Sequence, residues 1–305
     1  MFSLLRITAP LCLVFLAMVS SIASAEKGQS AVHKLAVDGI ERSYIVYRPR
    51  MFEARNAPLM IVLHGGFGNA KHMEERTGMN AVADSHQFVV VYPDGTGGRL
   101  ESMRERRTWN AGRCCGQAVE QNVNDVLFIN KIIEDVQSKY SIDTRRVYVT
   151  GISNGAMMAY RLACEIPDKI AAIIPVSGTL AVDNCDSAKD VPVLHIHGAK
   201  DENVPFSGGR GDNSLAGVSH RSVPDAINLI VRSRQCAARE EKHIGSGVQV
   251  FSYHCNNGAP VTLYLLKAAG HIWPGGNGIK DNVGNQNISA SNVAWEFAKQ
   301  FSKSK

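Results

Sequence analysis

Residues 146–160 read RVYVTGISNGAMMAY, and the change of character along them indicates the architecture of the whole chain. A run rich in β-formers leads into Gly151-Ile152-Ser153-Asn154-Gly155, and a helix-compatible run follows. A serine between two glycines at a strand-to-helix turn is typical of a nucleophile elbow, because glycine lets the strand and the helix approach closely. An ordinary tight turn is the competing interpretation. The pattern predicts that Ser153 projects its hydroxyl above a sheet, beside a helix amino end that favours developing negative charge.

The same alternation of strand and helix continues on both sides of this stretch. Short apolar or β-rich runs predict strands at residues 33–48 (a hairpin), 59–63, 88–92, 146–150, 171–176, 191–197, 249–254 and 261–267. Helical patterns between them predict helices at residues 71–85, 123–140, 154–164, 224–233 and 290–301. This alternation implies the α/β class, with a mostly parallel central sheet and helices on both of its faces.

The chain shows no internal repeat and no linker rich in Ser, Thr or Pro. We therefore expect residues 26–305 to form a single catalytic domain. Residues 207–221 contain four glycines and several polar residues, and they are expected to form an exposed surface loop.

The amino-terminal segment has the layout of a secretory signal. Arg6 precedes an apolar run at residues 9–19, and Ala23-Ser24-Ala25 ends a stretch of small residues. This layout predicts a signal peptide at residues 1–25 and a secreted protein, either extracellular or periplasmic. The apolar run is shorter than the roughly 20 residues that a membrane helix needs, and Glu26 rather than Cys follows the cleavage site. No membrane anchor is expected.

Charge and cysteine content limit the partners. The formal net charge is +5, and the sequence contains no block of basic residues, so nucleic acid is not an expected partner. The chain has seven cysteines, and removing Cys12 with the signal leaves six, an even number that favours disulfides in an exported protein. Cys-x-x-Cys and His-x-x-x-His spacings do not occur, so no metal and no cofactor are expected.

Six cysteines allow about fifteen connectivities. Cys164 with Cys185 and Cys236 with Cys255 are the attractive local pairs. That choice leaves Cys114 and Cys115 adjacent, where a vicinal bond competes with two free thiols or longer-range pairing.

A serine hydroxyl needs a base to activate it and an acid to orient that base. Asp201 follows the strand expected at residues 191–197, and His271 follows the strand expected at residues 261–267. Both loops leave the carboxyl ends of sheet strands, and the order Ser, Asp, His is the order of the α/β-hydrolase fold. We expect His271 to be the general base and Asp201 its partner, with Glu202 as the alternative acid.

Acyl transfer also needs two N–H donors for the oxyanion. The first is expected from Asn154, the residue after the nucleophile. The second is expected from Gly66 in the run His64-Gly65-Gly66-Phe67, with Phe67 as the alternative. His64 is interpreted as a buried residue that orders this turn rather than as a base, and His197 is interpreted in the same way.

Two tryptophans lie next to these motifs. Trp109 and Trp273 are candidates for lining a substrate pocket, because an aromatic ring offers flat apolar area. Core packing is the alternative for each.

Several segments together resemble the polyhydroxybutyrate depolymerase-like esterases, which are related to feruloyl and acetylxylan esterases. The matching segments are LHGG (63–66), YPDG (92–95), TWNAG (108–112), CCG (114–116), NDV (124–126) with FI (128–129), RVYVTGISNGAMM (146–158), HIHG (195–198) and GHIWPGG (270–276). The resemblance implies an α/β-hydrolase domain without a cofactor that hydrolyses esters through Ser153, Asp201 and His271. Leu127 stands where the family tends to have glycine, and the chain ends at Lys305 without the family's separate polymer-binding domain. Hydrolysis of solid polymer is therefore not expected.

The expected substrates are short-chain or hydroxyacyl esters such as hydroxybutyrate oligomers, or feruloyl or acetyl esters of plant polysaccharide. A secreted serine peptidase is one alternative, because it uses the same three side chains. A non-catalytic carbohydrate- or surface-binding protein on a hydrolase fold is the other.

Overall fold

The computed structural model describes residues 28–50, 56–98, 104–237, 239–256, 258–277 and 288–304. The signal peptide expected at residues 1–25 lies outside the described residues. No helix in the described ranges is both long enough and apolar enough to cross a membrane.

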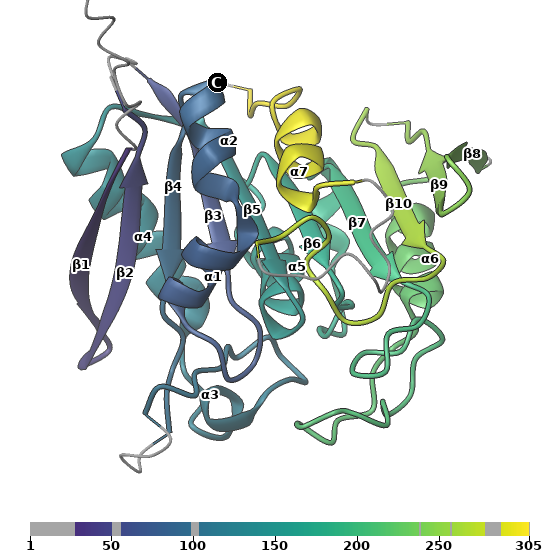
Figure 1. Cartoon of the computed structure of the whole chain (residues 1–305), viewed down its shortest axis with the longest axis horizontal. Helices are drawn as coiled ribbons and strands as arrows, with labels where there is room; N and C mark the ends of the chain where they lie inside the picture. Colours follow the sequence, from purple (N-terminus) through teal and green to yellow (C-terminus); the bar gives the residue numbers. More distant parts are fainter. Residues whose placement is uncertain are drawn as a thin grey trace, which may run out of the picture.

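The centre of the molecule is a ten-stranded sheet in the order β1-β2-β4-β3-β5-β6-β7-β10-β9-β8 (Figure 1). Its strands are β1 (Gln29–Val37), β2 (Ile40–Arg48), β3 (Ala57–Leu63), β4 (Val89–Pro93), β5 (Ile142–Ile152), β6 (Ala172–Val176), β7 (Val193–Gly198), β8 (Glu240–Ile244), β9 (Val248–Tyr253) and β10 (Val261–Leu266). The strands from β4 to β10 in this order are parallel. Both ends of the sheet add antiparallel strands. The predicted class and the mostly parallel sheet are confirmed.

Helices pack on both faces of the sheet, and each face carries its own apolar core. The first core includes side chains of α4 (Asp125–Lys139), α5 (Asn154–Glu165) and α6 (Val223–Ser233). The second includes side chains of α1 (Ala70–Thr77), α2 (Met79–His86) and α7 (Ala290–Ala298). Strands buried on both faces must be apolar throughout, which explains why β3, β4 and β6 read as continuous apolar runs rather than alternating ones.

The helix expected at residues 71–85 is two helices. Gly78 separates α1 from α2 with φ 69°, a left-handed conformation that glycine adopts without strain. The side chain of Asn69 caps α1 by accepting a hydrogen bond from the His72 amide. Three short elements were not predicted: α3 (Gly116–Glu120), the 3₁₀ helix η2 (Asp186–Asp190) and the exposed edge strand β8.

The six cysteines of the described chain form disulfides. Cys164 pairs with Cys185 and Cys236 pairs with Cys255, as the spacing favoured. Cys114 and Cys115 form a vicinal bond, which was one of the open alternatives.

Parallel strands in the middle of the sheet bring the loops that follow them to one edge (Figure 1). Strands β3, β5, β7 and β10 all end at this edge. The loops that leave them carry Gly66, Ser153, Asp201 and His271. Four segments that are distant in sequence therefore meet above the carboxyl ends of the sheet, the usual ligand position in an α/β fold.

Candidate active site

Ser153 occupies the turn between β5 and α5, with φ 57° and ψ −122°. A non-glycine residue at positive φ is uncommon and carries backbone strain that the surrounding structure must hold. The flanking glycines make this possible: a Cβ on Gly151 would lie 2.8 Å from the Gly155 carbonyl oxygen, and a Cβ on Gly155 would clash with the carbonyls of Leu63 and His64. The turn has the strained geometry of a nucleophile elbow.

His271 and Asp201 form a hydrogen bond, with 2.8 Å between His271 Nδ1 and Asp201 Oδ2. The other carboxylate oxygen of Asp201 accepts from the amides of Asn203 and Val204, at 2.9 and 2.8 Å. Burial alone would raise the pKa of Asp201, but the hydrogen bond and charge interaction with His271, together with His197 and the Val204 amide, lower the pKa below its usual value. Asp201 is therefore an anion that holds His271 Nδ1 as the protonated nitrogen.

Glu202 takes no part in this arrangement. Its side chain is exposed, and its carboxylate accepts a hydrogen bond from Asn213 Nδ2 at 2.6 Å. Of the two neighbouring acids, Asp201 is the one that reaches His271.

The two alternatives for the second oxyanion donor differ in their hydrogen bonds. The Phe67 amide donates to the Arg107 carbonyl oxygen at 2.7 Å, so it is already occupied. Within the described residues, the amide of Gly66 has no such partner. Gly66 also lies against Asn154, because a Cβ built on Gly66 would be 3.9 Å from Asn154 Cβ. This geometry favours Gly66 over Phe67.

His64 is fully buried and orders the turn that carries Gly66. Its Nδ1 donates to the Gly65 carbonyl oxygen at 2.7 Å, and its Nε2 accepts from the Gly95 amide at 2.9 Å. Burial lowers the pKa of His64 to about 4, so the ring is neutral near pH 7. These contacts agree with the structural interpretation of this histidine.

Trp109 and Trp273 do not line the pocket beside Ser153, which differs from the expectation. Trp109 is fully buried, and its indole Nε1 donates to the His64 carbonyl oxygen at 2.9 Å. Trp273 is only 4% exposed, and its indole donates to Ser291 Oγ at 3.2 Å. Both rings pack in the cores, and Trp109 supports the turn at His64 through its indole hydrogen bond.

Two buried or nearly buried carboxylates hold the loops around the pocket, and the sequence analysis assigned neither a role. Asp94 accepts from the Ala70 amide at 2.9 Å and from Ser43 Oγ at 2.6 Å. Asp125 accepts from the Asn110 amide at 2.7 Å and pairs with Arg42 at 2.5 Å. The PDG and NDV segments contained these acids, but nothing in their spacing indicated which amides they would bind.

A chain of buried hydrogen bonds ends behind Asp201. His197 Nε2 faces the Val204 carbonyl oxygen at 2.9 Å, so this nitrogen carries the proton, and Asp201 Oδ2 lies 3.5 Å from it. His197 Nδ1 then accepts from His195 Nε2 at 3.0 Å. His195 Nδ1 in turn accepts from the Tyr160 hydroxyl at 2.8 Å. Burial lowers the pKa of His195, and it lowers that of His197 to about 4, so both rings are neutral near pH 7.

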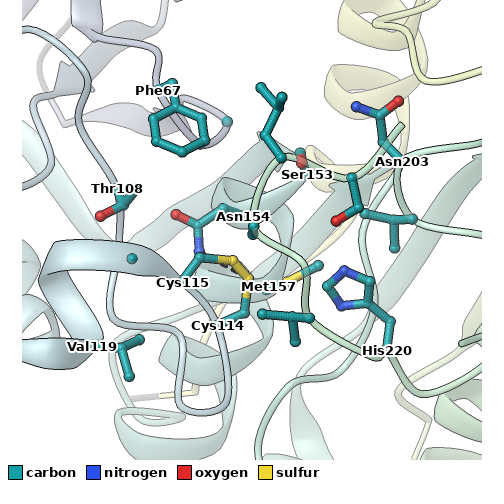
Figure 2. Close-up of a pocket in the computed structure, with 18 of the residues that line it drawn as sticks. Phe67, Thr108, Cys114, Cys115, Val119, Ser153, Asn154, Met157, Asn203 and His220 are labelled. Carbon is teal, nitrogen blue, oxygen red and sulfur yellow. Dashed lines mark hydrogen bonds between the residues drawn. A yellow bond between two sulfur atoms is a disulfide. The ribbon is translucent and has the colours of Figure 1, made fainter. Parts of the chain in front are cut away.

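Ser153 and His271 open into one pocket of about 620 Å³. One flank is formed by Phe67, Thr108, Cys114, Cys115 and Val119, with Met157 at the floor (Figure 2). Asn203 and His220 lie on the other side (Figure 2). The pocket is also lined by Val204, Ser214, Leu215, Ala216 and Val218. The loop at residues 207–221, expected to be an exposed surface loop, therefore builds part of the pocket wall. Within the described ranges, no group of three or more His, Cys, Asp or Glu side chains could hold a metal ion.

Comparisons with known proteins agree with this architecture. The family model described as Esterase PHB depolymerase matches residues 42–234. The bifunctional acetylxylan esterase/xylanase XynS20E of Neocallimastix patriciarum is 34% identical over 164 residues, covering 54% of this chain and 22% of that protein. Feruloyl esterase B of Piromyces equi is 26% identical over 269 residues, covering 86% of this chain and 45% of that protein. This chain thus spans less than half the length of either relative.

Among solved structures, an S-formylglutathione hydrolase from Agrobacterium tumefaciens aligns with a TM-score of 0.59 over 90% of this chain and 95% of that chain. At 12% sequence identity, this likeness bears on the fold alone. The sheet, the strained elbow at Ser153 and the family match over most of the described residues lead to one assignment: the chain belongs to the Esterase PHB depolymerase family and has its α/β-hydrolase fold.

Proposed function

We propose that this protein is a secreted serine esterase that hydrolyses carboxylic esters through Ser153, His271 and Asp201. The observation that carries the proposal is the 2.8 Å hydrogen bond between His271 Nδ1 and Asp201 Oδ2, at a pocket that Ser153 also lines. The buried Asp201 anion accepts the hydrogen bond from Nδ1, which leaves Nε2 of the same ring as the basic nitrogen. A general base for serine requires this state.

In the proposed reaction, the Ser153 hydroxyl attacks the ester carbonyl while His271 Nε2 takes its proton. The amides of Gly66 and Asn154 stabilise the oxyanion of the tetrahedral intermediate. His271 then gives the proton to the leaving alcohol, and an acyl-enzyme remains on Ser153. Water attacks the acyl-enzyme with the same base, which releases the acid and restores the serine. Asp201 stays ionised throughout and stabilises the imidazolium.

The substrate class is supported by the names of the relatives. They include an acetylxylan esterase, a feruloyl esterase and a poly(3-hydroxyalkanoate) depolymerase of Paucimonas lemoignei. We therefore propose acetyl or feruloyl esters of plant polysaccharide, or short-chain and hydroxyacyl esters such as hydroxybutyrate oligomers, as substrates. The signal layout at residues 1–25 supports export of the enzyme to the periplasm or the medium.

The proposal is tested by measuring turnover of p-nitrophenyl acetate and butyrate, methyl ferulate, acetylated xylan and hydroxybutyrate oligomers. Ser153→Ala should lower kcat by at least about a thousandfold, because it removes the nucleophile and the acyl-enzyme. A serine-directed phosphonate should add one adduct to the wild type and none to Ser153→Ala. Ser85→Ala, an exposed serine on α2, is the matched control and should keep full activity.

Two rival functions predict different results in the same assay. A serine peptidase would cleave peptide amides faster than matched esters. A non-catalytic binding protein would retain acetylated xylan or oligoester without turnover of any ester. Normal esterase activity in Ser153→Ala would contradict the proposed mechanism.

A further inference from the structure

His220 lies on the loop at residues 207–221 and has a fixed main chain. Its amide donates to the Gly209 carbonyl oxygen, and the Gly209 amide donates to the His220 carbonyl oxygen, both at 2.9 Å. The loop is anchored again near its tip, because the Asn213 amide donates to the Glu202 carbonyl oxygen at 3.0 Å. This double attachment holds the main chain that carries His220 at a defined place in the pocket wall.

The imidazole of His220 points into the pocket, on the side of Asn203 and across from Phe67 and Val119 (Figure 2). The side chain is half-buried, and within the described residues it forms neither a hydrogen bond nor an ion pair with another group. A partly desolvated imidazole with two unoccupied nitrogens leaves hydrogen-bonding capacity that a ligand can use.

His220 is close enough to the proposed triad for their charges to act on it. Burial lowers the pKa of His220, the Asp201 anion raises it, and His271 lowers it, with a net decrease. The ring is therefore neutral near pH 7, with one nitrogen as donor and the other as acceptor. A hydroxyl group, which also donates and accepts, complements such a ring, whereas a carboxylate would meet only one suitable nitrogen.

The side of the pocket on which His220 lies indicates which part of an ester it meets. His271 must protonate the leaving alcohol, so the alcohol portion departs on the His271 side. Asn203 and His220 line the pocket next to the His271–Asp201 pair, because the Asn203 amide binds Asp201 and the charges of Asp201 and His271 act on His220. The opposite flank presents Phe67, Val119 and the Cys114–Cys115 disulfide, and this apolar surface suits the acyl group.

We infer that His220 binds a hydroxyl group on the alcohol portion of the ester, so that the enzyme selects esters of polyols or sugars over esters of simple alkyl alcohols. This inference rests on the proposed esterase function and adds the chemistry of the leaving group. Discrimination arises because a buried polar group left unpaired by an alkyl ester weakens binding of that transition state.

The test uses two esters with the same acyl group, ethyl butyrate and glycerol 1-monobutyrate. His220→Phe keeps an aromatic ring but removes both nitrogens, and it should lower kcat/KM for the glycerol ester about tenfold, the loss of one hydrogen bond. The ethyl ester should change less than about twofold. His220→Gln places an amide near the ring position and should restore part of the preference for the glycerol ester. His72→Phe, an exposed histidine on α1, is the matched control.

The outcomes separate this inference from the function on which it rests. Both esters share one acyl-enzyme, so deacylation is common to them and the effect must appear in kcat/KM for the glycerol ester. Equal loss with both esters, or no loss with either, overturns the role of His220 and leaves the esterase function standing. If the wild type is not labelled by the phosphonate and hydrolyses neither ester, both the role of His220 and the proposed esterase function are overturned. Should His220→Phe fail to fold, His220→Leu gives the same comparison.

Discussion

The side-chain amide of Asn154 forms two hydrogen bonds with the main chain of Trp109: Oδ1 accepts from the Trp109 amide at 2.7 Å, and Nδ2 donates to the Trp109 carbonyl oxygen at 3.0 Å. Trp109 in turn holds the His64 carbonyl oxygen through its indole. The two proposed oxyanion donors, Gly66 and Asn154, come from separate loops, and this set of contacts fixes one loop against the other. Preorganised donors of this kind stabilise developing charge without rearrangement during the reaction.

We predict that Asn154→Ala lowers both stability and turnover. The substitution leaves the buried N–H of Trp109 without a partner and removes one of the two hydrogen bonds to its carbonyl, since the Cys115 amide still donates to that oxygen. This should lower the free energy of unfolding by about 1–3 kcal/mol. Loosening of the Gly66 turn should lower kcat about 10- to 100-fold with little change in KM. Urea unfolding and steady-state kinetics on p-nitrophenyl butyrate measure the two effects.

Trp109→Phe tests another part of this arrangement, because it keeps the main-chain contacts with Asn154 but removes the indole N–H and part of the buried ring. It should lower kcat less than Asn154→Ala does. Asn292→Ala, an exposed asparagine on α7, is the control and should change neither stability nor kcat. If Asn154→Ala shows the predicted decrease in the free energy of unfolding but an unchanged kcat, the contact supports the fold and not the proposed oxyanion site.

A second prediction concerns the two adjacent acids after β7. Asp201→Asn should lower kcat by roughly 10³- to 10⁴-fold, because a neutral amide neither holds Nδ1 as the protonated nitrogen nor stabilises the imidazolium. Glu202→Gln should leave kcat within about twofold, because the Glu202 side chain is exposed and bonds to Asn213. Steady-state kinetics on the two variants, side by side, measure the difference. A large loss of kcat with Glu202→Gln would contradict the assignment of Asp201 as the acid.

The sequence predicted the fold well where local signals carry it. Buried parallel strands must be apolar along their whole length, so β3, β4 and β6 were visible as uninterrupted runs. The edge strand β8 reads Glu-Glu-Lys-His-Ile and is exposed throughout, so it has no burial pattern to detect. The break at Gly78 was missed because a single glycine inside a helical pattern is usually tolerated.

Sequence analysis could predict a site residue only where that residue closely follows a strand in the chain. Ser153, Asp201 and His271 all stand at or shortly after the ends of strands β5, β7 and β10, and the parallel sheet brings such positions together. Trp109 has an equally suggestive position, yet its ring turns inward to the His64 carbonyl, because side-chain direction does not follow from a neighbouring motif. His220 lies far from every motif, and only the path of its loop brings it to the pocket.

A third prediction follows from the two buried histidines whose pKa is lowered to about 4, His64 and His197. Both are held in the neutral form by burial and by hydrogen bonds in which one ring nitrogen accepts. In the unfolded chain a histidine titrates near 6.5. Between pH 6.5 and about 4 the unfolded state therefore binds protons that the native state does not, and the free energy of unfolding falls as the pH is lowered. Inside this window, each histidine adds up to about 1.4 kcal/mol per pH unit to the slope of the unfolding free energy against pH. Above the window it adds nothing to the slope.

His64→Gln isolates one of these contributions. The variant should be less stable than the wild type at pH 7, because its amide cannot reproduce both ring contacts at their present positions. Its free energy of unfolding should nevertheless fall less steeply between pH 6.5 and 4.5, by about 1 kcal/mol per pH unit, since one titrating group has been removed. Carboxylates titrate in both proteins, so the difference between the two slopes reports the histidine alone. The exposed His72→Gln should keep the wild-type slope in the same urea titrations, and equal slopes for the wild type and His64→Gln would mean that His64 binds its proton as readily in the folded protein as in the unfolded chain.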